Sequence, residues 1–74
     1  MDDQKIVILT RDINGKRNSY KFKNRRVLYE FINSCKRPDS TDEILLVLQD
    51  GVCIYSQLMS SYSVLWEDIC GFYA

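Results

Sequence analysis

The sequence predicts an α+β fold: a four-stranded antiparallel sheet with two helices on one of its faces. Three observations support this class. Residues 44–48 form an unbroken apolar run, and Asp50-Gly51 follows it, a pair typical of a two-residue hairpin turn. Asn14-Gly15, a second pair of that type, follows the apolar residues 6–9. Apolar residues recur at helical spacing between the two hairpins and again near the end of the chain.

The first hairpin begins with residues 5–9, which are rich in β-branched side chains and predict a strand. A two-residue turn at Asn14-Gly15 would set the register and define two faces. The face assigned to the core carries Val7, Leu9, Tyr20 and Phe22. The opposite face is basic and carries Ile6, Ile8, Thr10, Arg17, Ser19, Lys21 and Lys23.

A helix is expected after Asn24, which is a good N-cap residue, and it should run to about Lys36. Its apolar stripe is formed by Val27, Leu28, Phe31, Ile32 and Cys35. Lys36 and Arg37 suit the negative end of the helix dipole, and Pro38 stops the helix. The stripe predicts that this helix packs on the sheet.

The central hairpin occupies residues 43–58, and its first strand is apolar on both faces. This indicates a strand that is covered or flanked on both sides. The expected register pairs Leu48 with Cys53 and Leu46 with Tyr55. Ser63 is then expected to cap a short final helix, along which lie Leu65, Trp66, Ile69, Phe72 and Tyr73.

The predicted element order is ββαββα, within one domain that covers residues 1–74. The two all-apolar strands should lie side by side in the middle, which gives the sheet order 2-1-3-4. No apolar run approaches the roughly 20 residues that span a bilayer. The acidic start of the chain lacks the basic residues of a secretory signal, so we expect a cytoplasmic protein without a membrane partner.

The composition argues against an enzyme. The chain has no histidine, which removes the usual general base and a common zinc ligand. It has no glycine-rich phosphate loop and no nucleophile elbow. Cys35, Cys53 and Cys70 are odd in number and widely spaced, so we interpret them as reduced, buried thiols. We expect no catalytic residue, metal or cofactor, and we interpret Asp39, Asp42 and Glu43 as a solvated loop.

The net charge is zero, but the charges are divided between the two halves of the chain. All ten basic residues and only two acids lie between residues 4 and 37, a net charge of +8. Residues 38–74 contain six acids and neither lysine nor arginine. Such an asymmetry suggests a charged partner.

The basic half also predicts a candidate site. Arg25 and Arg26 stand in the first turn of the expected helix, where the dipole disfavours cations by roughly 0.3–1 kcal/mol each. Lys21 and Lys23 precede them, and Arg17 belongs to the same strand. Free N–H groups at a helix N-terminus bind anions, so these five residues are candidates for contact with an anionic partner. The alternative is a solvated basic turn.

Two functions remain open on the sequence alone. In the first, the chain is a small protein-binding module, a stoichiometric inhibitor or regulator of a nucleic-acid-handling partner. Small proteins of phages and other mobile elements have this size and character. Tyr62, Trp66 and Tyr73 are candidate partner contacts, because aromatic residues dominate interface hot spots. In the second, the basic residues within 16–37 bind nucleic acid directly. The two charged halves could also pair in a homo-oligomer.

Overall fold

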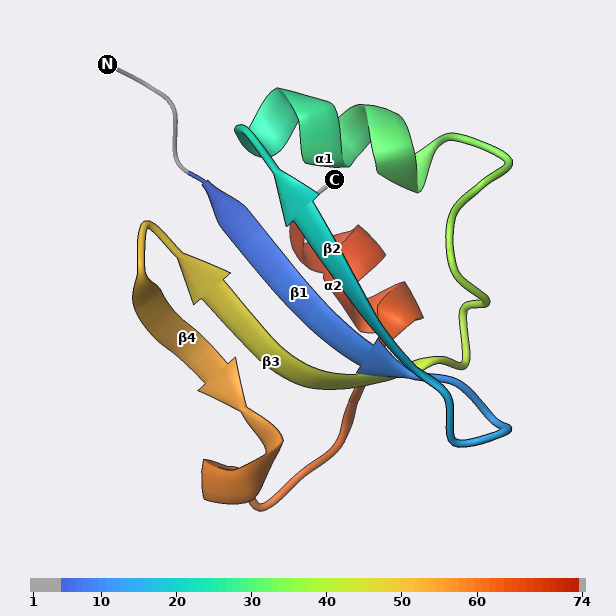
Figure 1. Cartoon of the computed structure of the whole chain (residues 1–74), viewed down its shortest axis with the longest axis vertical. Helices are drawn as coiled ribbons and strands as arrows, with labels where there is room; N and C mark the ends of the chain where they lie inside the picture. The colour runs from blue at the N-terminus through green and yellow to red at the C-terminus, as the bar shows by residue number, and fades with distance from the viewer. Residues whose placement is uncertain (1–4, 74) are drawn as a thin grey trace.

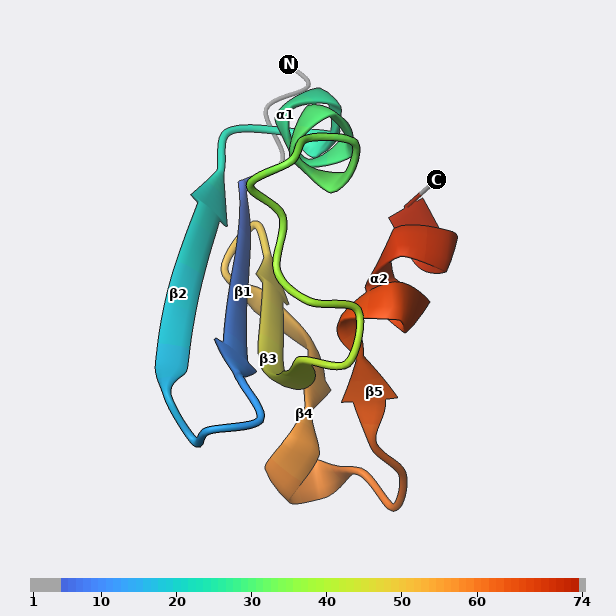
Figure 2. The same cartoon turned by 90° about the vertical axis from the view of Figure 1, so that its right-hand side faces the viewer.

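The computed structural model describes residues 5–73, and it confirms the predicted α+β class. In chain order the elements are β1 (Ile6–Arg11), β2 (Arg17–Phe22), α1 (Arg25–Ile32), β3 (Glu43–Gln49), β4 (Val52–Ser56), the 3₁₀ helix η1 (Gln57–Met59), β5 (Val64–Leu65) and α2 (Trp66–Tyr73). The antiparallel sheet has the predicted order β2-β1-β3-β4 (Figure 1). Both helices lie on one face of it (Figure 2). Neither α-helix in the described part is long and apolar enough to cross a membrane.

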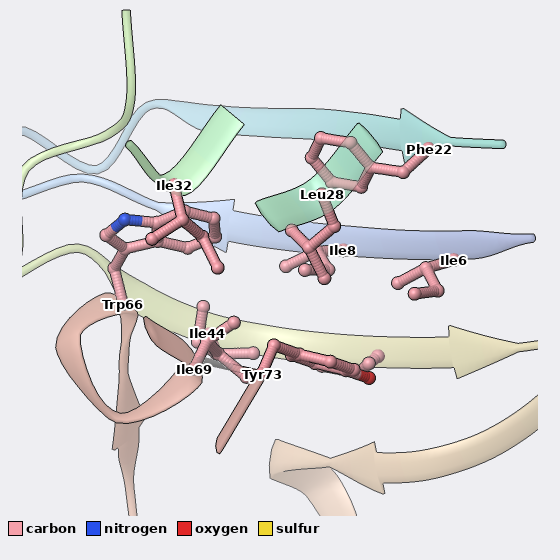
Figure 3. Packing of buried hydrophobic residues seen from close by; sticks show 10 residues of the cluster. Ile6, Ile8, Phe22, Leu28, Ile32, Ile44, Trp66, Ile69 and Tyr73 are labelled. Carbon is pink, nitrogen blue, oxygen red and sulfur yellow. The ribbon is translucent and has the colours of Figure 1, made fainter. Parts of the chain in front are cut away.

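The core lies between this face of the sheet and the two helices (Figure 3). The sheet contributes Ile6, Ile8, Phe22, Ile44 and Val47, and the helices contribute Leu28, Ile32, Trp66, Ile69 and Tyr73. Leu28 and Ile32 are buried as predicted, and Phe31 packs against the cluster from a half-buried position. Removal of this apolar surface from water is what holds the helices on the sheet.

The register of the first hairpin differs from the predicted one by a single residue. Ile8 lies opposite Tyr20 and Ile6 opposite Phe22. The turn has three loop residues, because the Asp12 carboxylate accepts hydrogen bonds from the N–H groups of Asn14 and Lys16, both at 2.9 Å. Gly15 takes the left-handed position with φ 84°.

One extra loop residue turns every β1 side chain to the other face. Ile6, Ile8 and Thr10 are therefore buried, and the assignment of Val7 and Leu9 to the core was wrong. The open face carries Val7 and Leu9, both half-buried, beside the exposed side chains of Arg17, Ser19, Lys21 and Lys23.

The turn of the second hairpin is confirmed. Asp50 and Gly51 have φ values of 54° and 78°, as a type I′ turn requires. Leu48 pairs with Cys53 as predicted, but Leu46 pairs with Ser56 and not with Tyr55. The register shifts because Ile54 is an extra residue in β4, a β-bulge.

Helix α1 ends earlier than expected, at Ile32. The side chains of Asn33 and Ser34 donate hydrogen bonds to the carbonyls of Tyr29 and Phe31, both at 2.9 Å, and such bonds compete with helix continuation. Cys35 consequently lies outside the helix and is exposed, which corrects its place in the apolar stripe.

The connection to α2 contains a strand that the sequence did not indicate. Glu43 and Ile44 of β3 pair with Leu65 and Val64 of β5, so α2 begins at Trp66 and Ser63 does not cap it. The Asp68 carboxylate instead accepts a hydrogen bond from the Leu65 N–H at 2.9 Å. The bulge at Ile54 and strand β5 therefore determine which residues lie on the side of the molecule next to β4.

The cysteines are all free, but their expected burial was wrong at two positions. Cys35 and Cys53 are exposed, and Cys70 is half-buried. Burial raises the pKa of the Cys70 thiol above its ordinary value, which keeps this side chain in its neutral form.

Candidate functional site

The five basic site residues predicted from the sequence do not form one cluster. Arg17 and Lys21 are separated by about 13 Å along β2, since a strand rises about 3.3 Å per residue. Arg17 lies opposite Arg11 at the far end of the hairpin. Lys21 and Lys23 are exposed near the start of α1. Lys21 and Lys23 are thus close to α1 in the chain, but Lys21 points to the open face of the sheet, opposite the helices, and Arg17 is apart from both.

The N-terminus of α1 is built as expected. The Asn24 side chain accepts a hydrogen bond from the Val27 N–H at 3.0 Å, and the first turn contains no acid. Both arginines, however, have partners within the chain. The Arg25 guanidinium lies over the Tyr73 ring, 5.6 Å from its centroid, and Arg26 forms a 3.9 Å ion pair with Glu30. Burial raises the pKa of the Tyr73 hydroxyl, and the charge of Arg25 opposes that rise.

Two of the three predicted aromatic contacts lie in the core. Trp66 is 1% exposed and packs edge-on against Phe31, with ring centroids 5.9 Å apart. Tyr73 is 6% exposed, and its hydroxyl donates to Gln49 Oε1 at 3.3 Å. This corrects the assignment of Trp66 and Tyr73 as partner contacts. Tyr62 is 67% exposed and remains available.

The three acids of the loop after α1 have separate surroundings. The Asp39 carboxylate accepts hydrogen bonds from the Thr41 hydroxyl and N–H, which lower its pKa. Burial raises the pKa of Asp42. Glu43 binds the Arg11 and Gln57 side chains, and these contacts lower its pKa. The pKa shift of each of the three carboxyl groups is therefore explained by its own neighbours within the fold.

Several apolar side chains of β4, η1, α2 and the loop before β5 are exposed. The most exposed are Val52, Ile54, Leu58, Met59, Tyr62 and Phe72. Their exposed fractions reach 97% at Leu58 and 89% at Met59. Side chains of this size gain several tenths of a kilocalorie to a few kilocalories per mole from burial, so a group of them favours contact with another molecule.

Three of these side chains, those of Ile54, Tyr62 and Phe72, line a groove with a volume of about 240 Å³, which we call the β4 groove. It is lined by Val47, Ile54, Tyr55, Tyr62, Val64, Asp68, Ile69, Phe72 and Tyr73. A second, more open hollow of about 390 Å³ shares Ile54, Tyr55 and Tyr62 with it and adds Met59. The Tyr55 hydroxyl donates to the Tyr62 carbonyl at 3.2 Å, which holds the loop beside β4.

Asp68 is the one charged residue that lines the β4 groove. Its position is set by α2, where the carboxylate bonds the Leu65 N–H in the first turn. Within residues 5–73 it has no ion-pair partner. The groove thus combines aliphatic and aromatic walls with a single negative charge that the fold does not neutralise.

Most residues of this site were not predicted from the sequence. Phe72 lies along the predicted final helix but was not among the candidate contacts; it is 69% exposed and packs edge-on against Tyr73, with ring centroids 4.9 Å apart. Leu58-Met59 gave a signal that could have been used, since two large apolar residues beside a turn have no sheet face to cover. Asp68 gave no such signal in the sequence, because its neighbours in the groove come from β4 and from the loop before β5, which are distant from it in the chain.

No family model, curated protein or solved structure matches this chain. The functional interpretation therefore depends on the geometry of the site.

Proposed function

We propose that the chain is a non-enzymatic protein-binding module that docks through the β4 groove and the exposed apolar side chains around it. The observation that carries this proposal is the exposure of Ile54, Met59, Tyr62 and Phe72 around the β4 groove and the second hollow, which share Ile54 and Tyr62. Interfaces between proteins bury such aromatic and methionine side chains at their centres. Its effect on the partner would be that of a stoichiometric inhibitor or regulator.

A protein partner fits this surface better than nucleic acid does. The groove is lined by the carboxylate of Asp68 and by no lysine or arginine. Phosphate groups would be repelled there, since nucleic-acid binding depends on the neutralisation of phosphates by cations. Nucleic acid would instead have to bind on the β2 side of the molecule.

The test is affinity capture from cells of the native host, with and without nuclease. A double variant, Met59→Ser with Phe72→Ser, should reduce the captured partner by at least about tenfold, which corresponds to about 1.4 kcal/mol. Val27→Ser with Tyr29→Ser is the matched control, because these residues are exposed on α1, away from the groove. Equal loss in both variants, or loss of all partners after nuclease, would contradict the proposal.

The stoichiometric character is tested with the captured partner. Its activity should fall linearly with added protein and reach an end point at a fixed molar ratio when the partner is held far above Kd. One copy of the protein that inactivates many partner molecules would contradict a non-enzymatic role.

Direct nucleic-acid binding is the second candidate, and one observation favours it: the first turn of α1 holds two arginines and no acid, and it follows exposed Lys21 and Lys23 in the chain. Binding of this kind weakens steeply with salt, with a log–log slope of about −0.9 per phosphate neutralised on duplex DNA. Lys21→Gln with Lys23→Gln should reduce that slope by about two under this candidate. Under the protein-binding proposal the same variant leaves partner capture unchanged.

A further inference from the structure

The two edges of the sheet differ in charge. Edge strand β2 carries Arg17 and Lys21, and cations of this kind discourage the addition of another strand. Edge strand β4, Val-Cys-Ile-Tyr-Ser, has no charged residue and no proline. In Figure 1 no other strand lies beyond β4 on its outer side. β4 is therefore the edge at which an extended chain can pair.

The backbone of β4 is oriented for such pairing. Gln49 and Val52 close the two-residue turn and pair with one another. Hydrogen-bonding direction alternates along an antiparallel strand, so the N–H and C=O of Cys53 point away from β3, toward the open edge. An added strand would meet these groups directly.

The β4 groove lies beside this edge and sets the chemistry of the side chain it would accept. Its volume of about 240 Å³ is below the roughly 300–1,000 Å³ of pockets that enclose a whole small molecule, and it suits a single long side chain. Ile54 and Val64 offer contact to an aliphatic stem, and the rings of Tyr62 and Phe72 attract a cation. Asp68 supplies a negative charge that has no ion-pair partner within the described residues.

We propose that β4 accepts an extended segment of a partner protein as an added strand, and that the β4 groove binds a lysine or arginine side chain of this segment, with the cation on Asp68. The proposal rests on the proposed function and adds the chemistry of the partner. Charge complementarity supports it, because Asp68 is the one charged residue that lines the groove and no lysine or arginine within residues 5–73 pairs with it, whereas Glu43 is already paired with Arg11. The combination of strand addition and side-chain pockets is an established mode of peptide recognition.

A second copy of the chain is a weaker occupant. β4 has neither lysine nor arginine, so pairing of β4 with β4 would supply no cation to Asp68 in either groove. Pairing of β4 with the basic edge β2 of another copy would be head-to-tail and would leave a free edge at each end, so it would not close.

The experiment selects binders to the full chain from a random peptide library displayed on phage. Enriched peptides should contain a lysine or arginine flanked by β-branched or aromatic residues. For one such synthetic peptide, Asp68→Asn should raise Kd by at least about tenfold, a large effect typical of a desolvated charge pair. Asparagine still accepts the Leu65 N–H hydrogen bond, so α2 keeps its cap. Glu67→Gln, on the same turn but outside the groove, should stay within about twofold.

A double-mutant cycle identifies the contact. Replacement of the peptide cation by norleucine should weaken binding to the parental chain by at least about tenfold and should weaken binding to Asp68→Asn little. The Cys53 amide should exchange more slowly in the complex, which reports strand addition.

Three results would overturn the inference: no enriched peptide, enriched peptides without a cation, or peptides insensitive to Asp68→Asn. If the free protein forms oligomers, and Asp68→Asn abolishes them, the inference is overturned and the occupant is a second copy of the chain. If the Met59/Phe72 variant loses its cellular partner while Asp68→Asn keeps it, the proposed function stands and the cation inference fails.

Discussion

At the scale of the residue, Glu43 joins three elements through one carboxylate. It lies on β3, forms an ion pair with Arg11 of β1 and accepts a hydrogen bond from Gln57 of η1. These contacts favour the ionised form and lower its pKa. Their stabilising effect is therefore present above the pKa of about 4.3 that glutamate has in the unfolded chain, and it is lost as pH falls through the lower folded value.

Glu43→Gln should consequently lower the free energy of unfolding by about 0.5–1 kcal/mol near neutral pH, since both partners are partly exposed. The difference between variant and parent should shrink as the pH falls below the folded value, where the parental carboxyl is protonated as well. Urea denaturation at several pH values measures both effects. Glu30→Gln, which removes only the exposed 3.9 Å pair with Arg26, is the control and should have a smaller effect. A destabilisation by Glu43→Gln that is independent of pH would contradict this account.

At the scale of the element, two glycines have opposite roles. Gly51 has φ 78° in the turn between β3 and β4, where a side chain is strained, while Gly71 lies inside α2 with open space at its Cβ position. Gly51→Ala should destabilise the protein by about 1–2 kcal/mol, the cost of a left-handed conformation. Gly71→Ala should stabilise it by about 0.5–1 kcal/mol through the higher helix propensity of alanine. Thermal unfolding of both variants tests the pair, and a shift of the same sign in both would show that one of the two backbone assignments is wrong.

At the scale of the whole molecule, two aromatic residues of α2 differ in burial: Trp66 lies in the core and Phe72 is exposed. Trp66 packs against both Tyr20 and Phe31, which joins β2, α1 and α2 in one aromatic cluster. Trp66→Ala should cost about 3–5 kcal/mol, a large part of the 5–15 kcal/mol that stabilises a typical domain. Phe72→Ala should change stability by less than about 1 kcal/mol, because that ring is 69% exposed. Near-equal melting of the two variants, measured by circular dichroism, would refute this division between core and docking surface.

The sequence by itself determined the number and order of the main elements and the antiparallel sheet order. Its signals were local: turn dipeptides, the Asn24 cap, and apolar periodicity on α1. Asp50-Gly51 and Leu28 have the roles that these signals indicated. The candidate site was foreseen only in Tyr62 and, for the second candidate function, in the basic residues near α1.

The tertiary structure decided which face and which aromatic residues are buried. Alternation defines two faces of β1, but one added loop residue at Asp12 decides that Ile8 and not Leu9 enters the core. Trp66 and Phe72 differ in burial because β5 fixes where α2 begins and therefore which of its sides meets the sheet. Asp68 and Ile54 line one groove only because the fold brings residues of β4 and α2, distant in sequence, to the same hollow. Such contacts are properties of the packed elements, and local sequence patterns do not contain them.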